Sequence, residues 1–229
     1  CKKILHYHRV LAPAFVVFPR GRTIRRPASL GFPLIVKSLV EEASRGISQA
    51  SVVDSDEKLE QRVRFIHERV GTDAIAEQYI DGRELYVGVL GNDRVKVLPT
   101  WEIMLDKLPA EANRIATERV KWNQDYQLRH GIDWGPARLE DAVEKRIARL
   151  SRRIYRILDL SGYARLDFRL DPQGRLYLLE ANPNPDIADG DEFAASAESA
   201  GISYPKLLDK ILQLGLPRRL DARFRRPVQ

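Results

Sequence analysis

Charged and polar residues follow a strand-like pattern in the C-terminal third of the chain. From 163 to 170 apolar residues alternate with polar ones, and this period of two predicts a strand with Arg165 and Asp167 on one face. The residues at 171–174, Asp-Pro-Gln-Gly, are typical of a turn, and an apolar return strand follows at 175–180. The two strands should therefore form a hairpin with its charged side chains on one side.

The return strand ends in residues that could bind a metal ion. Glu180 should lie within a rung or two of Asp167, with Asn182 close behind it. Two carboxylates and an amide oxygen beside Arg165 are the hard ligands that Mg²⁺ prefers, with its other positions left to water and phosphate. The alternative is a hairpin with one solvated charged face. The apolar run into Glu180 argues against it, because unpaired carboxylates at a buried strand end are costly.

A lysine closes the apolar run at 34–36. Lys37 could present a point charge to a nucleotide phosphate, although a lone strand-end lysine is more often simply solvated. The loop that follows offers a hydroxyl at Ser44 and a glycine at Gly46, with backbone amides that could cover a phosphate. By itself this loop is a weak indication.

The segment 77–84 could bind the base and sugar of a nucleotide. A strand edge can contact adenine through main-chain N–H and C=O groups while an apolar side chain packs on the ring. A carboxylate at the end of the segment could accept both ribose hydroxyls. The alternative is a hairpin across the turn dipeptide Asp81-Gly82, with glutamates that face water. The candidate residues are Glu77, Gln78, Tyr79, Ile80 and Glu84.

Strands and helices mix along the chain without a regular alternation, which predicts an α+β fold. Helices are indicated by apolar residues at spacings of three and four, and strands by short apolar runs. The expected strands are 15–18, 34–37, 74–80, 84–90, 94–98, 163–170 and 175–180. The expected helices are 56–70, about 139–158 and about 204–214, and 107–136 is expected to be irregular.

A boundary near residues 91–100 would give two subdomains, each with its own sheet. We expect a smaller subdomain at 1–95, a larger one with the metal site at 96–215, and a basic tail at 216–229. The tail carries much of the net charge of +6, which comes from 38 basic and 32 acidic residues. A solvated face or frayed end explains such a tail better than a nucleic-acid contact does.

The amino-acid composition limits the classes of protein to which this chain can belong. A content of 44% hydrophobic and 31% charged residues is ordinary for a soluble globular chain. The single cysteine, at position 1, allows no disulfide framework and suits the cytoplasm. No apolar run approaches the ~18 residues of a membrane span. Met104 is the only methionine, so a piece of a longer or processed protein is expected.

Five short motifs occur in the order and approximate spacing of the ATP-grasp ligases. Over about residues 1–215 the chain resembles the D-alanine–D-alanine ligases and their relatives, although each motif alone is weak. The resemblance implies an ATP-grasp fold, in which two subdomains clamp a nucleotide between mixed or antiparallel sheets. The motifs are Val36-Lys37, Ser44-x-Gly46-Ile47, Glu77-Gln78-Tyr79-Ile80-x-Gly82-x-Glu84, Arg165-x-Asp167-Phe168 and Glu180-x-Asn182.

The resemblance assigns ATP binding to the first three motifs. Lys37 looks like the strand lysine that contacts the phosphates, and Lys121 like the second lysine that does so. Ser44 and Gly46 resemble the loop that closes over the phosphates. The implied adenine hinge and ribose carboxylate are Glu77, Gln78, Tyr79, Ile80 and Glu84.

The last two motifs resemble the metal-binding and catalytic part of the family. Asp167, Glu180 and Asn182 match the ligands of two Mg²⁺ ions, for which Mn²⁺ is an alternative, and Glu180 matches the ligand that bridges them. Arg165 matches the arginine that steadies the acyl phosphate, and Lys121 is the second expected catalytic residue. The implied activity is ATP-dependent carboxylate–amine ligation through an acyl phosphate.

Departures from the family's pattern leave other activities open. Glu41-Glu42-Ala43-Ser44 replaces a glycine-and-serine loop, and carboxylates beside phosphates are unfavourable. Pro183-Asn184-Pro185 replaces a glycine–hydrophobic–threonine turn, so D-alanine is not supported as the substrate. The alternatives are a phosphotransferase and a non-catalytic ATP-binding regulatory module.

The expected partners follow from the same resemblance. They are small-molecule carboxylate and amine substrates, a family-type N-terminal domain that this chain does not include and, as an open option, a second copy of the chain. Neither a membrane nor a nucleic acid is expected as a partner.

Overall fold

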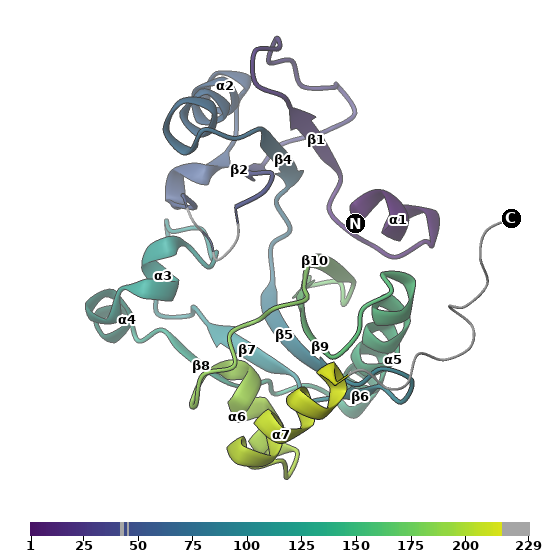
Figure 1. The fold of residues 1–229 in the computed structure, drawn as a ribbon. Coiled ribbons are helices and arrows are strands. Elements are labelled where there is room, and N and C mark those ends of the chain that lie inside the picture. Colours follow the sequence, from purple (N-terminus) through teal and green to yellow (C-terminus); the bar gives the residue numbers. More distant parts are fainter. Residues whose placement is uncertain (42–43, 45, 217–229) are drawn as a thin grey trace, which may run out of the picture.

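The computed structural model describes residues 1–41, 44 and 46–216, and its strands form two antiparallel sheets (Figure 1). A four-stranded sheet has the order β1-β4-β2-β3, and a six-stranded sheet has the order β10-β9-β5-β7-β8 with β6 paired to β5. Helices beside antiparallel sheets confirm the α+β class. The four-stranded sheet contains β1 (Phe15–Phe18), β2 (Leu34–Ser38), β3 (Val52–Val53) and β4 (Ala74–Gln78). The six-stranded sheet contains β5 (Arg83–Leu90), β6 (Lys96–Val97), β7 (Trp101–Met104), β8 (Asp133–Pro136), β9 (Tyr163–Leu170) and β10 (Leu176–Asn182).

Helices pack on both sheets, with α2 beside the four-stranded sheet at the top of Figure 1. Around the six-stranded sheet, α5, α6 and α7 lie in the lower half of the same view. The α-helices are α1 (Lys2–Tyr7), α2 (Asp56–Phe65), α3 (Glu118–Trp122), α4 (Gln124–His130), α5 (Asp141–Ile157), α6 (Glu192–Ser199) and α7 (Tyr204–Gly215). Two short segments have other helical forms, η1 (Gln49–Ser51) and η2 (Ile66–Val70).

The helix expected at 56–70 is confirmed as α2 followed by the π-helical turn η2. Ser55 caps it, because its Oγ accepts the backbone N–H of Lys58 at 3.3 Å. Leu59 and Val63 are fully buried and join the core of the four-stranded sheet. The amphipathic period therefore holds the helix against that sheet.

The two faces of β9 show why its charged side chains lie together on one side of the sheet. Leu166 and Phe168 are fully buried and pack in one core with Ile154 of α5. Arg165 and Asp167 alternate with them and so lie on the opposite face, as the period of two predicted. The helix α5 thus fills one side of the sheet and leaves the other to the charged residues.

The hairpin considered across 81–82 does not form. The strand β4 pairs with β1 and β2, whereas β5 pairs with β9, β7 and β6, so residues 79–82 cross from one sheet to the other. Gly82 has φ +130°, and a Cβ there would lie 2.1 Å from the carbonyl oxygen of Leu170. Because β5 belongs to the larger sheet, a division at residue 95 does not match the sheets, which change at 79–82.

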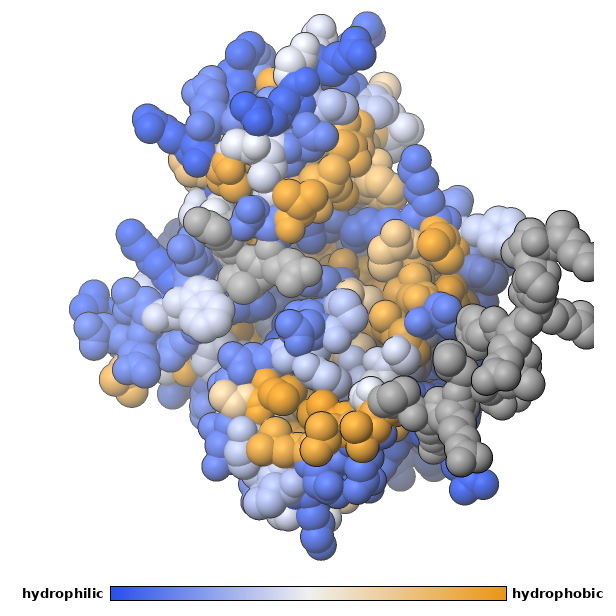
Figure 2. Space-filling view, in the orientation of Figure 1, coloured by the Kyte–Doolittle hydropathy of each residue, from blue (hydrophilic) through white to orange (hydrophobic). Residues whose placement is uncertain are grey.

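Several elements were not expected from the sequence. The stretch 107–136, expected to be irregular, contains α3, α4 and β8, and the helices α1 and α6 have no counterpart among the expected elements. No helix in the described part of the chain is long and apolar enough to cross a membrane. Apolar side chains gather over α7 in Figure 2, where Leu208 and Leu212 are exposed. The predicted basic tail lies outside the described residues from 217 onward.

Candidate functional site

A cavity of about 530 Å³ lies between the two sheets. Lys37 and Glu77 line it from the four-stranded sheet, Leu179 and Glu180 line it from β10, and Lys2 lines it from α1. The structure therefore brings the strand lysine of the first sheet to the same cavity as the end of the hairpin. This is the arrangement that a nucleotide held between two sheets requires.

Two lysines share one buried carboxylate in this cavity. Glu77 is 2% exposed, and its Oε2 and Oε1 lie 3.3 Å from Lys37 Nζ and 3.2 Å from Lys2 Nζ. Burial disfavours the charged form of Lys37, but Glu77 and Glu180 outweigh it and raise the pKa of this lysine. Burial dominates at Lys2 and lowers its pKa, with the charge of Lys37 acting in the same direction. With two lysines and one carboxylate, the group of Lys2, Lys37 and Glu77 therefore has a net charge of +1 when all three are ionised.

Glu84 is also buried, and both of its oxygens are engaged. Tyr86 Oη donates to Oε1 at 2.9 Å, and the guanidinium of Arg169 pairs with Oε2. Arg169 also donates to the carbonyl oxygens of Gly82, at 3.0 Å, and Arg114, at 2.9 Å. A ribose that uses Glu84 must share it with these donors.

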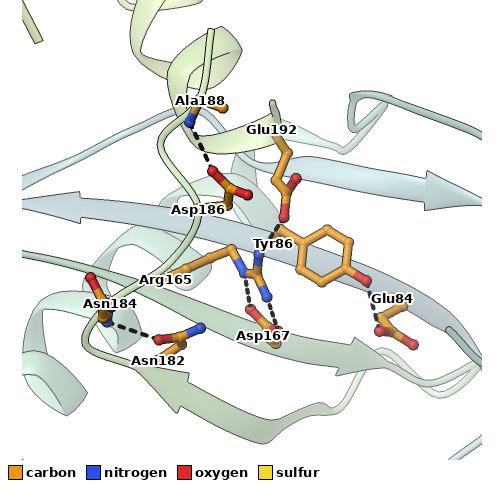
Figure 3. Close-up of polar contacts among 9 residues, drawn as sticks. All are labelled: Glu84, Tyr86, Arg165, Asp167, Asn182, Asn184, Asp186, Ala188 and Glu192. Carbon is orange, nitrogen blue, oxygen red and sulfur yellow. Dashed lines mark hydrogen bonds and ion pairs between the residues drawn. The ribbon is translucent and has the colours of Figure 1, made fainter. Parts of the chain in front are cut away.

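Arg165 links two carboxylates on the open face of β9 (Figure 3). Its Nε and Nη2 donate to Asp167 at 2.8 and 2.9 Å, and its Nη1 pairs with Glu192 of α6. The guanidinium carbon lies 4.9 Å from the ring centre of Tyr86. Burial disfavours the charge of Arg165, but Asp167 and Glu192 outweigh it and raise its pKa. The residues expected to hold metal and acyl phosphate are thus adjacent.

Glu180 lies directly opposite Asp167 in the register of β9 and β10, after an irregularity between residues 178 and 180. Asn182 is opposite Arg165, and its Oδ1 accepts the backbone N–H of Asn184 at 2.8 Å. Burial, and then the charge of Asp167, raise the pKa of Glu180. Two neighbouring carboxylates with this mutual repulsion fit a divalent cation, which would favour their ionised forms.

The donor set has only two carboxylates. In the part of the chain that the structure describes, no three His, Cys, Asp or Glu side chains group to hold a metal ion. The expected set differs because its third member, Asn182, supplies an amide oxygen. Asp167 would have to share its oxygens with Arg165 to bind a cation. The set fits Mg²⁺, which takes few protein ligands and keeps its other positions for water and phosphate.

A second cavity, of about 760 Å³, is also lined by Glu180. Lys121, Arg165 and Asn182 line it near that residue. Farther along, its lining includes Trp122 of α3, together with Trp134, Tyr163, Asp186, Asp191 and Glu192. Glu180 therefore borders both cavities.

Hydrogen bonds connect the loop after β2 to the helices α2 and α3. Gly46 donates its N–H to Glu118 Oε2 of α3 at 3.0 Å, and its carbonyl accepts from Arg62 of α2. Ser44 lines the cavity of Lys37 and has a left-handed φ of 60°. Ser44 thus lies at the cavity, whereas Gly46 connects the loop to α3. Residues 42, 43 and 45 of the predicted loop lie outside the described residues.

The segment predicted as the adenine hinge lies only partly at the cavity of Lys37, and its contact with a nucleotide stays a prediction. The backbone N–H of Gln78 donates to Ala14 at 2.8 Å, and that of Tyr79 donates to Pro33 at 3.0 Å, so both are already used. Ile80 is buried. Of the segment 77–80, Glu77 is the residue that lines the cavity of Lys37.

No pattern in the sequence pointed to Lys2, Tyr86, Arg169 or Glu192 as site residues. Lys2 belongs to a six-residue helix with no motif, and Glu192 lies ten residues beyond the hairpin. The alternation of β9 places Arg169 on the face of Arg165, but its pairing with Glu84 follows from the register Glu84↔Arg169 between β5 and β9. That pairing joins strands far apart in the sequence, so no local pattern signals it.

Comparison with known proteins matches residues 10–213 to the family described as D-ala D-ala ligase C-terminus. This chain belongs to that family. A D-alanine–D-alanine ligase from Bordetella petrii is 34% identical over 218 residues, which cover 92% of this chain and 61% of the relative. An uncharacterized protein, y4sG, from Sinorhizobium fredii is 32% identical over 213 residues, covering 93% of this chain and 60% of the relative.

Solved structures of D-alanine–D-alanine ligases also match this chain. The crystal structure of a D-alanine–D-alanine ligase from Bacillus anthracis has a TM-score of 0.75 at 25% identity, over 94% of this chain and 65% of that one. These neighbours confirm the ATP-grasp fold expected from the motifs. The chain spans about 60% of the length of those two curated relatives.

Proposed function

We propose that this chain is the ATP- and metal-binding part of a carboxylate–amine ligase that works through an acyl phosphate. The observation that carries the proposal is the position of Glu180, which lines both the lysine-bearing cavity between the sheets and the cavity that contains Arg165 and Lys121. A group at this position can act on a nucleotide in one cavity and on an organic substrate in the other.

The first cavity suits the polyphosphate of ATP. Lys2 and Lys37 share the carboxylate of Glu77, and Mg²⁺ would offset the charge of Glu180, so the lysines retain positive charge for an anion. Asp167, Glu180 and Asn182 would hold Mg²⁺, which would neutralise phosphate charge there. Residues of both sheets therefore orient the γ-phosphate toward Glu180 and the second cavity.

The second cavity suits the organic substrates. An oxygen of the substrate carboxylate attacks the γ-phosphorus, and cleavage of the bond to the β–γ bridging oxygen gives an acyl phosphate and ADP. An amine nitrogen then attacks the acyl carbon, phosphate leaves, and the nitrogen loses a proton to give the amide. Arg165 and Lys121 supply positive charge for the acyl phosphate and for the oxyanion of the second step.

The test is a reaction of the full-length protein with ATP, Mg²⁺ and pools of carboxylic acids, with hydroxylamine in place of the amine. An acyl phosphate reacts with hydroxylamine to give a hydroxamate, so the proposal expects a hydroxamate, ADP and free phosphate in equal amounts. The hydroxamate then identifies the acid, and an amine pool identifies the second substrate.

Two outcomes would overturn the proposal. Transfer of the γ-phosphate to an acceptor that keeps it, without hydroxamate, would show a phosphotransferase. ATP binding with no ADP formed in any pool would show a regulatory module. Arg165→Lys serves as a comparison, because it keeps one charge but loses the bidentate contact with Asp167.

A further inference from the structure

The cavity beyond Glu180 has a negative wall formed by acidic side chains between residues 186 and 192. Among the described residues that line it, the positive side chains are Lys121 and Arg165. The carboxylates that line it are Glu180, Asp186, Asp191 and Glu192. Bound Mg²⁺ would offset the charge of Glu180 and Arg165 pairs with Glu192, so Asp186 and Asp191 carry the remaining negative charge of the lining.

The guanidinium of Arg165, which lines this cavity, is already paired with carboxylates of the protein. Arg165 Nε and Nη2 donate to Asp167 and its Nη1 pairs with Glu192, so every nitrogen of its guanidinium faces a protein carboxylate. Arg165 is 8% exposed and stacks on Tyr86. Arg165 is therefore held beside Asp167, where the proposed function uses its charge, and it offers no unpaired nitrogen to a carboxylate that binds at Asp186 and Asp191.

The acidic residues act on one another at the far wall. Burial, followed by the charges of Asp186 and Glu192, raises the pKa of Asp191. Asp186 is oriented by the backbone N–H of Ala188, which donates to its Oδ1 at 2.9 Å. In Figure 3 Asp186 and Glu192 lie on the same side of Arg165. A positive group placed here would relieve the mutual repulsion of these carboxylates.

Aromatic rings complete the lining. Trp122 of α3, Trp134 of β8 and Tyr163 of β9 border the cavity, whereas the face of Tyr86 is already covered by Arg165. The hydroxyl of Tyr163 donates to Asn184 Oδ1 at 2.9 Å. Aromatic faces next to carboxylates bind alkylammonium groups well, because both attract a cation while the rings also cover the methylene chain. This lining is poorly suited to a free carboxylate.

We infer that the amine substrate carries a second cationic group and no carboxylate, as linear diamines and polyamines do. The inference rests on the proposed function, because it places the reacting nitrogen at the Glu180 end of the cavity. The second ammonium group then lies at Asp186 and Asp191, with the methylene chain along the aromatic rings. An amino acid of similar length would bring its carboxylate against that wall, which rejects it.

The experiment compares three probes that differ at one end: 1,5-diaminopentane, pentylamine and 5-aminopentanoate. Their affinities for the full-length protein are measured by calorimetry in the presence of Mg²⁺ and a non-hydrolysable ATP analogue. We expect the diamine to bind about tenfold more tightly than pentylamine, and 5-aminopentanoate to bind weakest. Asp186→Asn and Asp191→Asn should each reduce the preference for the diamine, while Asp189→Asn, on the same loop but outside the cavity lining, should not.

The outcomes separate this inference from the proposed function. Tight binding of the ATP analogue with equal affinity for all three amines, or with a preference for 5-aminopentanoate, would overturn the inference alone. Failure to bind the ATP analogue would overturn the proposed function. A diamine preference that survives in Asp186→Asn and Asp191→Asn would place the cation elsewhere and also contradict the inference. Calorimetry of ATP-analogue binding in each variant shows whether the fold and first cavity are intact.

Discussion

Two charged groups on either side of Glu180 have opposite compositions. In the first cavity two lysines, Lys2 and Lys37, share one carboxylate. In the second cavity one arginine, Arg165, is shared by two carboxylates. The first group has positive charge to spare for phosphates, whereas the second has negative charge to spare for cations. The fold thus places two sites for ligands of opposite charge close together, because the residues of each site come from different helices and strands.

The largest effect is expected at Glu180, where the two groups meet. Glu180→Gln removes a charge that would bind Mg²⁺, so ADP release should fall by about a thousandfold, in line with the several kcal/mol that a metal contributes. Thermal unfolding should change little, because Glu180 has like charge to Asp167 as its neighbour and its pKa is raised. Turnover close to that of the unaltered protein would show that Glu180 does not bind the metal.

The crossing between the sheets should be the next most sensitive point. Gly82→Ala places a Cβ 2.1 Å from the carbonyl oxygen of Leu170 at a left-handed φ, so it should destabilise the fold by about 2–4 kcal/mol. Gly174→Ala is the matched control, because its φ is +74° but a Cβ there meets nothing within 4 Å. Chemical denaturation measures both variants. Equal losses would mean that φ alone, and not the close approach at the crossing, limits residue 82.

The lysine group should show a smaller effect on ATP binding. Lys37→Met should weaken binding of an ATP analogue about 10- to 30-fold, because it leaves Glu77 with one lysine and reduces the positive charge of the cavity. Lys58→Met is the control. It should leave affinity unchanged, because it removes an exposed lysine of α2 that is paired with Asp54. Unchanged affinity in Lys37→Met would show that the positive charge of the first group does not bind the nucleotide, and would contradict the contrast between the two groups.

The pH dependence of ATP binding should show the smallest effect. Burial lowers the pKa of Lys2, whereas Glu77 and Glu180 overcome burial and raise that of Lys37. As the pH rises, Lys2 therefore loses its proton and its attraction for phosphate before Lys37 does. The affinity of the unaltered protein should decline in two alkaline steps, and Lys2→Met should lack the earlier one. Identical profiles would show that Lys2 does not contact the nucleotide.

The sequence could predict the parts of this site that depend on local pattern. The hairpin of β9 and β10 follows from alternation and a strong turn, so the positions of Asp167 and Glu180 could be predicted from them. The crossing at 79–82 could not, because Asp81-Gly82 has the composition of a hairpin turn and the pairing of β5 with β9 is remote in sequence. The short helices α1, α3 and α4 have too few turns for a clear period, so Lys2 gave no signal.

The most direct test of the account measures ATP-analogue binding to the full-length protein with and without Mg²⁺, in the unaltered protein and in Glu180→Gln. We expect Mg²⁺ to strengthen binding to the unaltered protein and to the control Asp189→Asn. Glu180→Gln should lose this effect while it retains the metal-independent affinity due to the lysines. The same Mg²⁺ dependence in Glu180→Gln would contradict the claim that Glu180 joins the two cavities through a metal.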